Sequence, residues 1–150
     1  MRRAPARLTL PAVPDRAAEL LQSVPLFAGL GRRDLQRLAT TMKPRRFAVG
    51  EAIAREGERG AWFFVIEEGT ARVTIGGDAV RELGPGDYFG EIALIAETDR
   101  TATVTSETEM RCYTLTNWEF RAIVESNPQI AWQFLEAVAN MVQEADQREA

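Results

Sequence analysis

Two short strand-like runs, each closed by glycine, follow one another in WFFVIEEGTARVTIGGD, residues 62–78. Aromatic and β-branched side chains dominate the first run, and apolar and polar residues alternate through residues 71–75. Gly76 and Gly77 then supply a two-residue turn of the type that needs positive φ. This stretch predicts antiparallel β-structure with a tight hairpin.

The same pattern extends in both directions, over about residues 46–115. Glycines recur at short intervals, and Gly84-Pro85-Gly86-Asp87 predicts a second tight turn. Other strand-like runs cover residues 101–105 and 110–115. Several short strands at this spacing indicate a β-sandwich or β-barrel.

Helical signals flank the β-segment on its N-terminal side. Asp15 is expected to be the N-cap of a first helix that stops before Pro25. A second helix is expected at about 32–42, with Gly31 as N-cap and Pro44 after its end. Residues 1–13 hold three arginines among prolines and lack the apolar region of a signal peptide, which favours a disordered arm.

Two further helices are predicted on the C-terminal side. Thr116 and Glu119 form a capping-box pattern that starts a helix at about 117–126, and Asn127-Pro128 starts another at about 128–147. The last helix carries a heptad seam and, beside it, a second apolar stripe. The seam is Ala131, Leu135, Val138, Val142 and Ala145, and the stripe is Ile130, Phe134, Ala137 and Met141. One stripe is expected to pack on the β-core, leaving the other for a ligand or a partner helix; a single wide buried stripe is the alternative.

Composition excludes several classes of function. The chain has 150 residues, 45% hydrophobic and 27% charged, as expected for one globular domain without a membrane span. With 22 acidic and 18 basic residues, it lacks the basic balance of a nucleic-acid-binding surface. It has no His, which excludes His-based metal sites and triads, and with them a cupin-type enzyme. The single Cys112 allows no internal disulfide and is expected to be buried in a strand; we expect a cytoplasmic protein.

One segment, residues 89–104, departs from simple alternation. Gly90 would allow a close approach to a ligand, and a helical turn after it would direct the N–H groups of Ile92 and Ala93 outward as an anion site. Arg100 could grip two phosphate oxygens, and Glu91 could accept a hydrogen bond from a ribose hydroxyl. These features indicate a nucleotide with a monoanionic phosphate. From the residues alone, the alternative stays open that Gly90 is a turn, Glu91 a solvated carboxylate and Arg100 a surface ion-pair partner.

The chain resembles the cyclic nucleotide-binding domain family, which occurs in kinase regulatory subunits, cyclic-nucleotide-gated channels and the catabolite activator protein family. The likeness runs from Pro25 to about Met141 and is strongest in YFGEIAL, residues 88–94, and RTATV, residues 100–104. It includes a frame of glycines, Gly50, Gly57, Gly69, Gly84, Gly86 and Gly90. It implies an α+β fold, a β-roll (a double-stranded β-helix or jelly-roll-like barrel) flanked by N-terminal helices and two C-terminal helices. The domain would span 14–150, with helices in 15–43, the β-roll in 46–115, the phosphate-binding cassette in 89–104 and the last helices in 117–147.

The resemblance also implies roles for individual residues. Glu91 would accept the ribose 2′-hydroxyl, Arg100 would bind the phosphate, and the backbone of Gly90, Ile92 and Ala93 would cradle it. Thr101 would lie beside phosphate and base, and Val73 would line the opposite wall, although Val73 also fits a plain core position. Some relatives that bind cyclic AMP carry Ala where this chain has Thr101, so Thr101 leaves the base preference open.

We therefore expect a regulatory domain that binds cyclic AMP in preference to cyclic GMP and moves its C-terminal helix in response. It would not be an enzyme, and it would need no cofactor or metal beyond the nucleotide ligand. Its partners would be an unknown effector protein or a second copy bound through the C-terminal helix, with no nucleic acid and no membrane. The chain would be a stand-alone domain or a piece of a longer protein. The alternative is a β-roll interaction module that no longer binds nucleotide.

Overall fold

The computed structural model describes residues 13–149, and its strands form two four-stranded antiparallel sheets. The first sheet has the order β1-β8-β3-β6 and the second β2-β7-β4-β5. The strands are β1 (Lys43–Phe47), β2 (Ala52–Ala54), β3 (Trp62–Glu68), β4 (Ala71–Ile75), β5 (Asp78–Leu83), β6 (Tyr88–Phe89), β7 (Thr103–Ser106) and β8 (Met110–Thr116). The two sheets form a β-roll and not a closed barrel, so the predicted α+β fold is confirmed and its barrel description is too strong.

Both predicted turns form. Gly76 and Gly77 have φ of 59° and 86°, and they join β4 to β5 as a two-residue hairpin. In the second turn, the Asp87 N–H donates to the Gly84 carbonyl over 3.0 Å, and Gly86 has φ of 88°. Positive φ is the reason for glycine at these positions.

The N-terminal helices differ from the expectation at their ends. Helix α1 (Val13–Gln22) begins before Asp15, so Asp15 lies in its first turn and is not its N-cap. Pro14 is also in this first turn, where a proline is tolerated because the N–H that it lacks would have no partner within the helix. Helix α2 (Arg32–Thr41) has Gly31 as N-cap, as predicted. Pro44 lies two residues beyond the C-cap, inside edge strand β1, where proline disrupts no interior ladder. The arm predicted for 1–13 lies outside the described residues except for Val13, which is helical.

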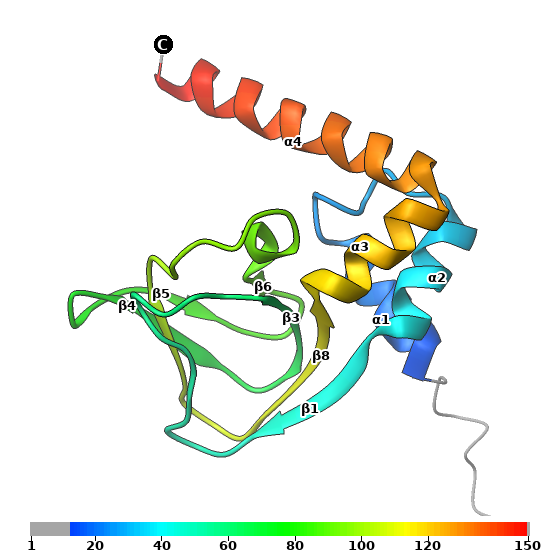
Figure 1. Ribbon diagram of the computed structural model, residues 1–150. Coiled ribbons are helices and arrows are strands. Elements are labelled where there is room, and N and C mark those ends of the chain that lie inside the picture. The colour runs from blue at the N-terminus through cyan, green and yellow to red at the C-terminus, as the bar shows by residue number, and fades with distance from the viewer. Residues whose placement is uncertain (1–12, 150) are drawn as a thin grey trace, which may run out of the picture.

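The C-terminal helices are α3 (Asn117–Ser126) and α4 (Pro128–Glu149). The predicted capping box is present, since the Thr116 hydroxyl accepts from the Glu119 N–H and the Glu119 carboxylate accepts from the Thr116 N–H. Figure 1 shows α1, α2 and α3 gathered at one end of the β-roll, with α4 leaving them as one straight helix. The start of α4 packs on α3 and on the connection between α1 and α2: the Phe134 ring centroid lies 5.1 Å from that of Phe120 and 5.6 Å from that of Phe27.

The predicted packing of one α4 stripe is present only at the start of the helix. Ile130 and Phe134 are buried in a core that joins the helices to β3 and β8, whereas Met141, from the same stripe, is 37% exposed. Leu135 and Val142 of the heptad seam are 57% and 56% exposed. Only the first turns of α4 are fixed by packing, and most of its length is free of the β-roll.

Two hydrophobic cores explain the continuous apolar run in β3. Phe63 and Val65 face the helices together with Tyr113 and Leu115 of β8. Phe64 and Ile66 point between the two sheets, where they meet residues of the second sheet. A strand buried on both faces has no polar alternation. Cys112 is fully buried in the core between the sheets, as predicted.

A buried carboxylate attaches α1 to the first sheet. Glu67 of β3 accepts a 2.6 Å hydrogen bond from the Tyr113 hydroxyl and lies 3.2 Å from Nε of Arg16 on α1. Nε of Arg111 lies 3.3 Å from its other oxygen. Charged partners on both sides offset the cost of burying Glu67. Within residues 13–149, no helix has both the length and the apolar composition needed to cross a bilayer.

Candidate functional site

A short 3₁₀ helix, η2 (Glu91–Leu94), begins at Gly90, which has φ of 83° and ψ of 15°. A side chain at Gly90 would be strained by this left-handed conformation and would also lie 2.4 Å from the Trp62 carbonyl oxygen. The predicted helical turn is thus confirmed, but one of its two predicted free donors is not. The Ala93 N–H donates to the Gly90 carbonyl over 3.1 Å, because a 3₁₀ helix already pairs residue i with i+3. The Ile92 N–H has no recorded partner within residues 13–149.

The backbone of Arg100 is fixed by the loop between β2 and β3. Its N–H donates to the Glu58 carbonyl, and its carbonyl accepts from the Gly57 N–H, both over 2.8 Å. Its guanidinium donates from Nη2 to the Trp62 carbonyl, also over 2.8 Å. The backbone and the guanidinium of Arg100 are therefore both held by hydrogen bonds within the protein.

Arg100 has no ion-pair partner in the part of the chain that the structure describes. Its side chain is half-buried, and this burial lowers the pKa of the guanidinium, with the nearby Glu91 charge acting in the opposite direction. A partly desolvated cation whose only hydrogen-bond acceptor is one carbonyl has capacity for an anion.

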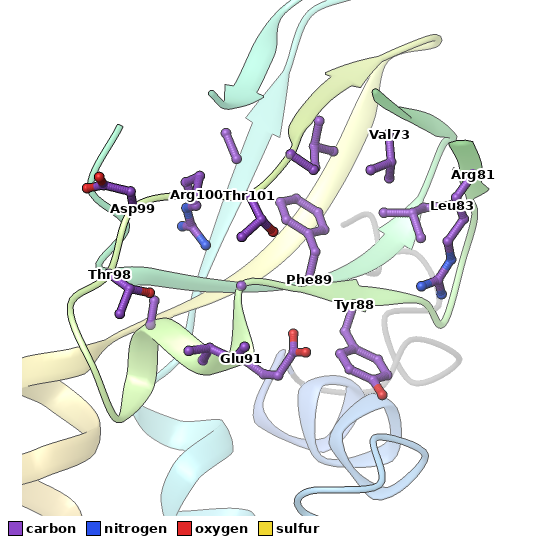
Figure 2. Close-up of a pocket in the computed structure, with 16 residues that line it drawn as sticks. Val73, Arg81, Leu83, Tyr88, Phe89, Glu91, Thr98, Asp99, Arg100 and Thr101 are labelled. Carbon is purple, nitrogen blue, oxygen red and sulfur yellow. The ribbon is translucent and has the colours of Figure 1, made fainter. Parts of the chain in front are cut away.

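All seven residues predicted for the site line one cavity of about 250 Å³. Figure 2 shows Arg100 and Thr101 on one side of it and Val73 on the other, with Glu91 along the lower edge between them. Gly90, Ile92 and Ala93 complete the predicted set. Val73 lies on β4, which belongs to the second sheet and pairs with β7. The η2 helix follows β6 of the first sheet. The cavity therefore lies at the junction of the two sheets.

Glu91 lies close to Tyr88 at the same cavity. Burial raises the pKa of the Tyr88 phenol, and the negative charges of Glu91 and Asp87 act in the same direction, whereas Arg81 opposes them. The phenol therefore stays protonated near neutral pH and can donate a hydrogen bond. The cavity thus combines a fixed cation, a free backbone N–H, a carboxylate acceptor and an apolar far wall.

Among the cavity residues that sequence reasoning missed are Arg81, Leu83 and Tyr88. The Gly76-Gly77 hairpin signals only that some residue of β5 lies opposite Val73 and shares its face of the sheet. Regular pairing across a two-residue turn places Val80 opposite Val73. A register shift next to Val73 puts Arg81 there instead.

No residue of α4 lines the cavity. Met141 and Val142 of α4 are 37% and 56% exposed. The structure shows α4 apart from the site.

Residues 44–127, more than half of the chain, match the sequence model described as the cyclic nucleotide-binding domain. The chain belongs to the cyclic nucleotide-binding domain family. Members of this family act as regulatory ligand-binding domains, and their β-roll is the fold described above.

Curated relatives of this cyclic nucleotide-binding domain include channels and kinase subunits. A cyclic nucleotide-gated potassium channel of Rhizobium etli is 40% identical over 75% of this chain, and the match covers 32% of the channel. The cAMP-dependent protein kinase regulatory subunit of Yarrowia lipolytica is 39% identical over 63% of the chain and 26% of the subunit. The chain thus spans about a third or less of the length of these relatives.

Solved structures show the same fold. The N-terminal domain of a transcriptional regulator from Streptomyces coelicolor superposes with a TM-score of 0.81 at 26% identity, over 87% of this chain and 95% of that one. The regulatory domain of Toxoplasma gondii PKA, crystallised with cAMP, gives a TM-score of 0.68 at 30% identity, over 76% of this chain and 45% of that one.

Proposed function

We propose that this cyclic nucleotide-binding domain is a sensor that prefers cyclic AMP to cyclic GMP and responds through α4. The observation that carries the proposal is the unpaired, half-buried guanidinium of Arg100, fixed beside the start of η2 and facing the cavity. A cyclic phosphodiester carries one negative charge, which one arginine and nearby backbone N–H groups can balance.

The proposed pose places each part of the ligand against matching chemistry. The phosphate lies between Arg100 and the Ile92 N–H, and Glu91 accepts a hydrogen bond from the ribose 2′-hydroxyl. The base lies toward Val73 and Leu83, because these side chains supply the apolar wall across the cavity. Ala93 contributes its small side chain to the cradle and not its N–H, which is already bonded within η2.

The base preference is supported by relatives and not by a contact in this chain. The Yarrowia lipolytica relative is named a cAMP-dependent protein kinase regulatory subunit, and the Toxoplasma gondii PKA regulatory domain was crystallised with cAMP. Thr101 is exposed, with a hydroxyl able to reach either the phosphate or a guanine amino group. We propose that it serves the phosphate, a contact that ignores the base.

Coupling to α4 is proposed through η2, which has a ligand side and a core side. Glu91 and Ile92 face the cavity, while Leu94 is buried in the helical core with Phe120 and Phe134. A small shift of η2 on binding would therefore move a side chain packed among the residues that hold α3 and α4. The exposed seam of α4, including Leu135 and Val142, is then available to the ligand, to an effector protein or to a second copy.

The deciding experiment is calorimetric titration with cyclic AMP, cyclic GMP and the open monophosphate 5′-AMP. We expect binding of both cyclic nucleotides, tighter for cyclic AMP, and much weaker binding of 5′-AMP. Recovery of the bound nucleotide unchanged would support a role without catalysis. Absence of any binding by a folded protein would contradict the proposal and favour an interaction module.

Competition of the two cyclic nucleotides against a fluorescent analogue tests the base preference separately. If cyclic GMP wins clearly, and Thr101→Ala abolishes that advantage, the proposed preference and the proposed role of Thr101 are both wrong. An unchanged ratio in Thr101→Ala would support a base-independent contact.

A further inference from the structure

Gly60, in the loop between β2 and β3, lies directly behind the Arg100 guanidinium. A Cβ placed on Gly60 would lie 2.3 Å from Nε and 2.4 Å from Cζ of Arg100. Both distances are far inside van der Waals contact, so a side chain at Gly60 and the observed guanidinium exclude each other. The Arg100 guanidinium occupies the space that a side chain at residue 60 would fill.

Backbone conformation does not explain this glycine. Gly60 is absent from the glycines with positive φ, whereas Gly57 and Gly90 on either side of the site have φ of 84° and 83°. An L-residue therefore fits the backbone at Gly60, and its requirement for glycine is one of space alone.

The loop cannot simply retreat from a new side chain. The Gly60 N–H donates to the Thr98 carbonyl over 3.2 Å, and the adjacent residues Arg59 and Asp99 form an antiparallel β-bridge. With the two hydrogen bonds between Arg100 and residues 57 and 58, this ladder fixes the loop against the segment that carries Arg100. The flexible end of the Arg100 side chain is thus the part that would move.

We propose that Gly60 is a positioning residue for the phosphate site: by lacking a side chain, it lets the Trp62 carbonyl hold the Arg100 guanidinium at the cavity. The inference rests on the proposed function, since Arg100 must be the phosphate ligand for its position to matter. It adds a residue that does not line the cavity and touches no ligand.

Gly60→Ala tests this directly. The methyl group should displace the guanidinium and break its bond to the Trp62 carbonyl, while the displaced cation regains water. We therefore expect affinity for cyclic AMP to fall by at least about tenfold, with little change in the midpoint of urea unfolding. A merely structural glycine would give the opposite result, a shifted midpoint with affinity retained.

Gly84→Ala is the matched control. Gly84 also lies in the β-roll, also has no positive φ, and has no atom within 4 Å of a built Cβ. Its affinity for cyclic AMP should stay within about threefold of the parent. Gly90→Ala is unsuitable, because its left-handed φ would add backbone strain.

A double-mutant cycle with Arg100→Ala separates positioning from other effects. If Gly60 acts through Arg100, Gly60→Ala should cost nothing further in the Arg100→Ala background. An equal loss in both backgrounds, or parent-like affinity of Gly60→Ala, would overturn the role of Gly60 and leave the proposed function intact. Failure of the parent protein to bind cyclic AMP would overturn both.

Discussion

At the scale of single residues, Arg100 is held before any ligand arrives. Its backbone pairs with the β2–β3 loop, and its guanidinium rests on the Trp62 carbonyl in the space left by Gly60. A ligand therefore need not restrain a freely rotating side chain, and less conformational entropy is lost on binding. Folding instead bears a free-energy cost, because the Arg100 charge is partly buried without an ion-pair partner among the described residues.

Arg100→Ala should lose about 2–5 kcal/mol of binding free energy, or roughly thirty-fold to several thousand-fold in affinity. Arg100→Lys should also bind poorly, because an ammonium cannot donate to the Trp62 carbonyl and grip two phosphate oxygens in one plane. Calorimetry on the folded variants measures both losses. Affinity of Arg100→Ala within threefold of the parent would contradict the assignment.

Glu91 should act through the sugar. Glu91→Gln keeps an acceptor oxygen, so its loss should be smaller than that of Glu91→Ala. With 2′-deoxy cyclic AMP, the parent should show a penalty that disappears in Glu91→Ala, since the hydrogen bond is then already gone. Equal penalties for the deoxy ligand in both proteins would place the ribose contact at another residue.

At the scale of elements, the movement proposed for α4 depends on how little of the helix is held by packing. Its first turns are anchored by Ile130 and Phe134, and its exposed apolar residues lie further along. A ligand can shift this helix only through different affinities for its two placements. The groove between η2, α3 and α4, lined in part by Leu94, Trp118 and Leu135, is where such a movement would first alter packing.

Saturating cyclic AMP should slow amide hydrogen exchange across about 135–147, in addition to the cassette at 89–104. The reason is that closure over the base, or tighter packing on η2, would order a part of α4 whose apolar side chains, such as Leu135 and Val142, are now exposed. Exchange measured with and without nucleotide, read by mass spectrometry, tests this. Protection confined to 89–104 would mean that α4 stays static and that the signal leaves by another surface.

Elements with local signals were predictable from the sequence. The capping box fixes the start of α3, and the glycine pair fixes the β4–β5 turn, because both signals act within four residues. The phosphate-binding cassette at 89–104 was predicted from a family resemblance that is strongest around Gly90 and in residues 100–104. The start of α1 was missed because a capping residue such as Asp15 is equally at home inside a first turn, where its charge suits the helix dipole.

Features that depend on tertiary geometry were not predictable. Arg81 enters the cavity through a bulge that no turn signal announces. Gly60 looks like any loop glycine until the Arg100 side chain is placed against it. The exposure of the outer part of α4 was not predictable either, because periodicity reveals an apolar stripe but not how much of it another surface covers.

At the scale of the whole molecule, two groups in strand β8 link stability to alkaline pH. Burial raises the pKa of the Cys112 thiol to about 12. The pKa of Tyr113 is also raised to about 12, first by burial and then by its hydrogen bond to the Glu67 carboxylate and the charge of that group. In an unfolded chain, the pKa would be about 8.5 for the cysteine thiol and about 10 for the tyrosine phenol.

Because both pKa values are higher in the folded state, their stabilising effect is complete below about pH 8.5 and is lost as the pH rises toward about 12. The free energy of unfolding should therefore decline over this interval. Tyr113→Phe should flatten the decline above about pH 10, and Cys112→Ala its earlier part. Urea titrations at several pH values measure the slopes; identical slopes in parent and variants would contradict this linkage.

The complete burial of Cys112 in a chain with one cysteine has a practical meaning. A chromogenic disulfide reagent can reach this thiol only when β8 detaches from the strands on either side of it, so the colour reaction counts opening events of the β-roll. A ligand that binds only the closed form at 100 times its Kd would slow that reaction about a hundredfold. The reaction rate of the native Cys112 thiol thus reports how much of the protein is bound to ligand, and it can rank candidate ligands without an engineered cysteine.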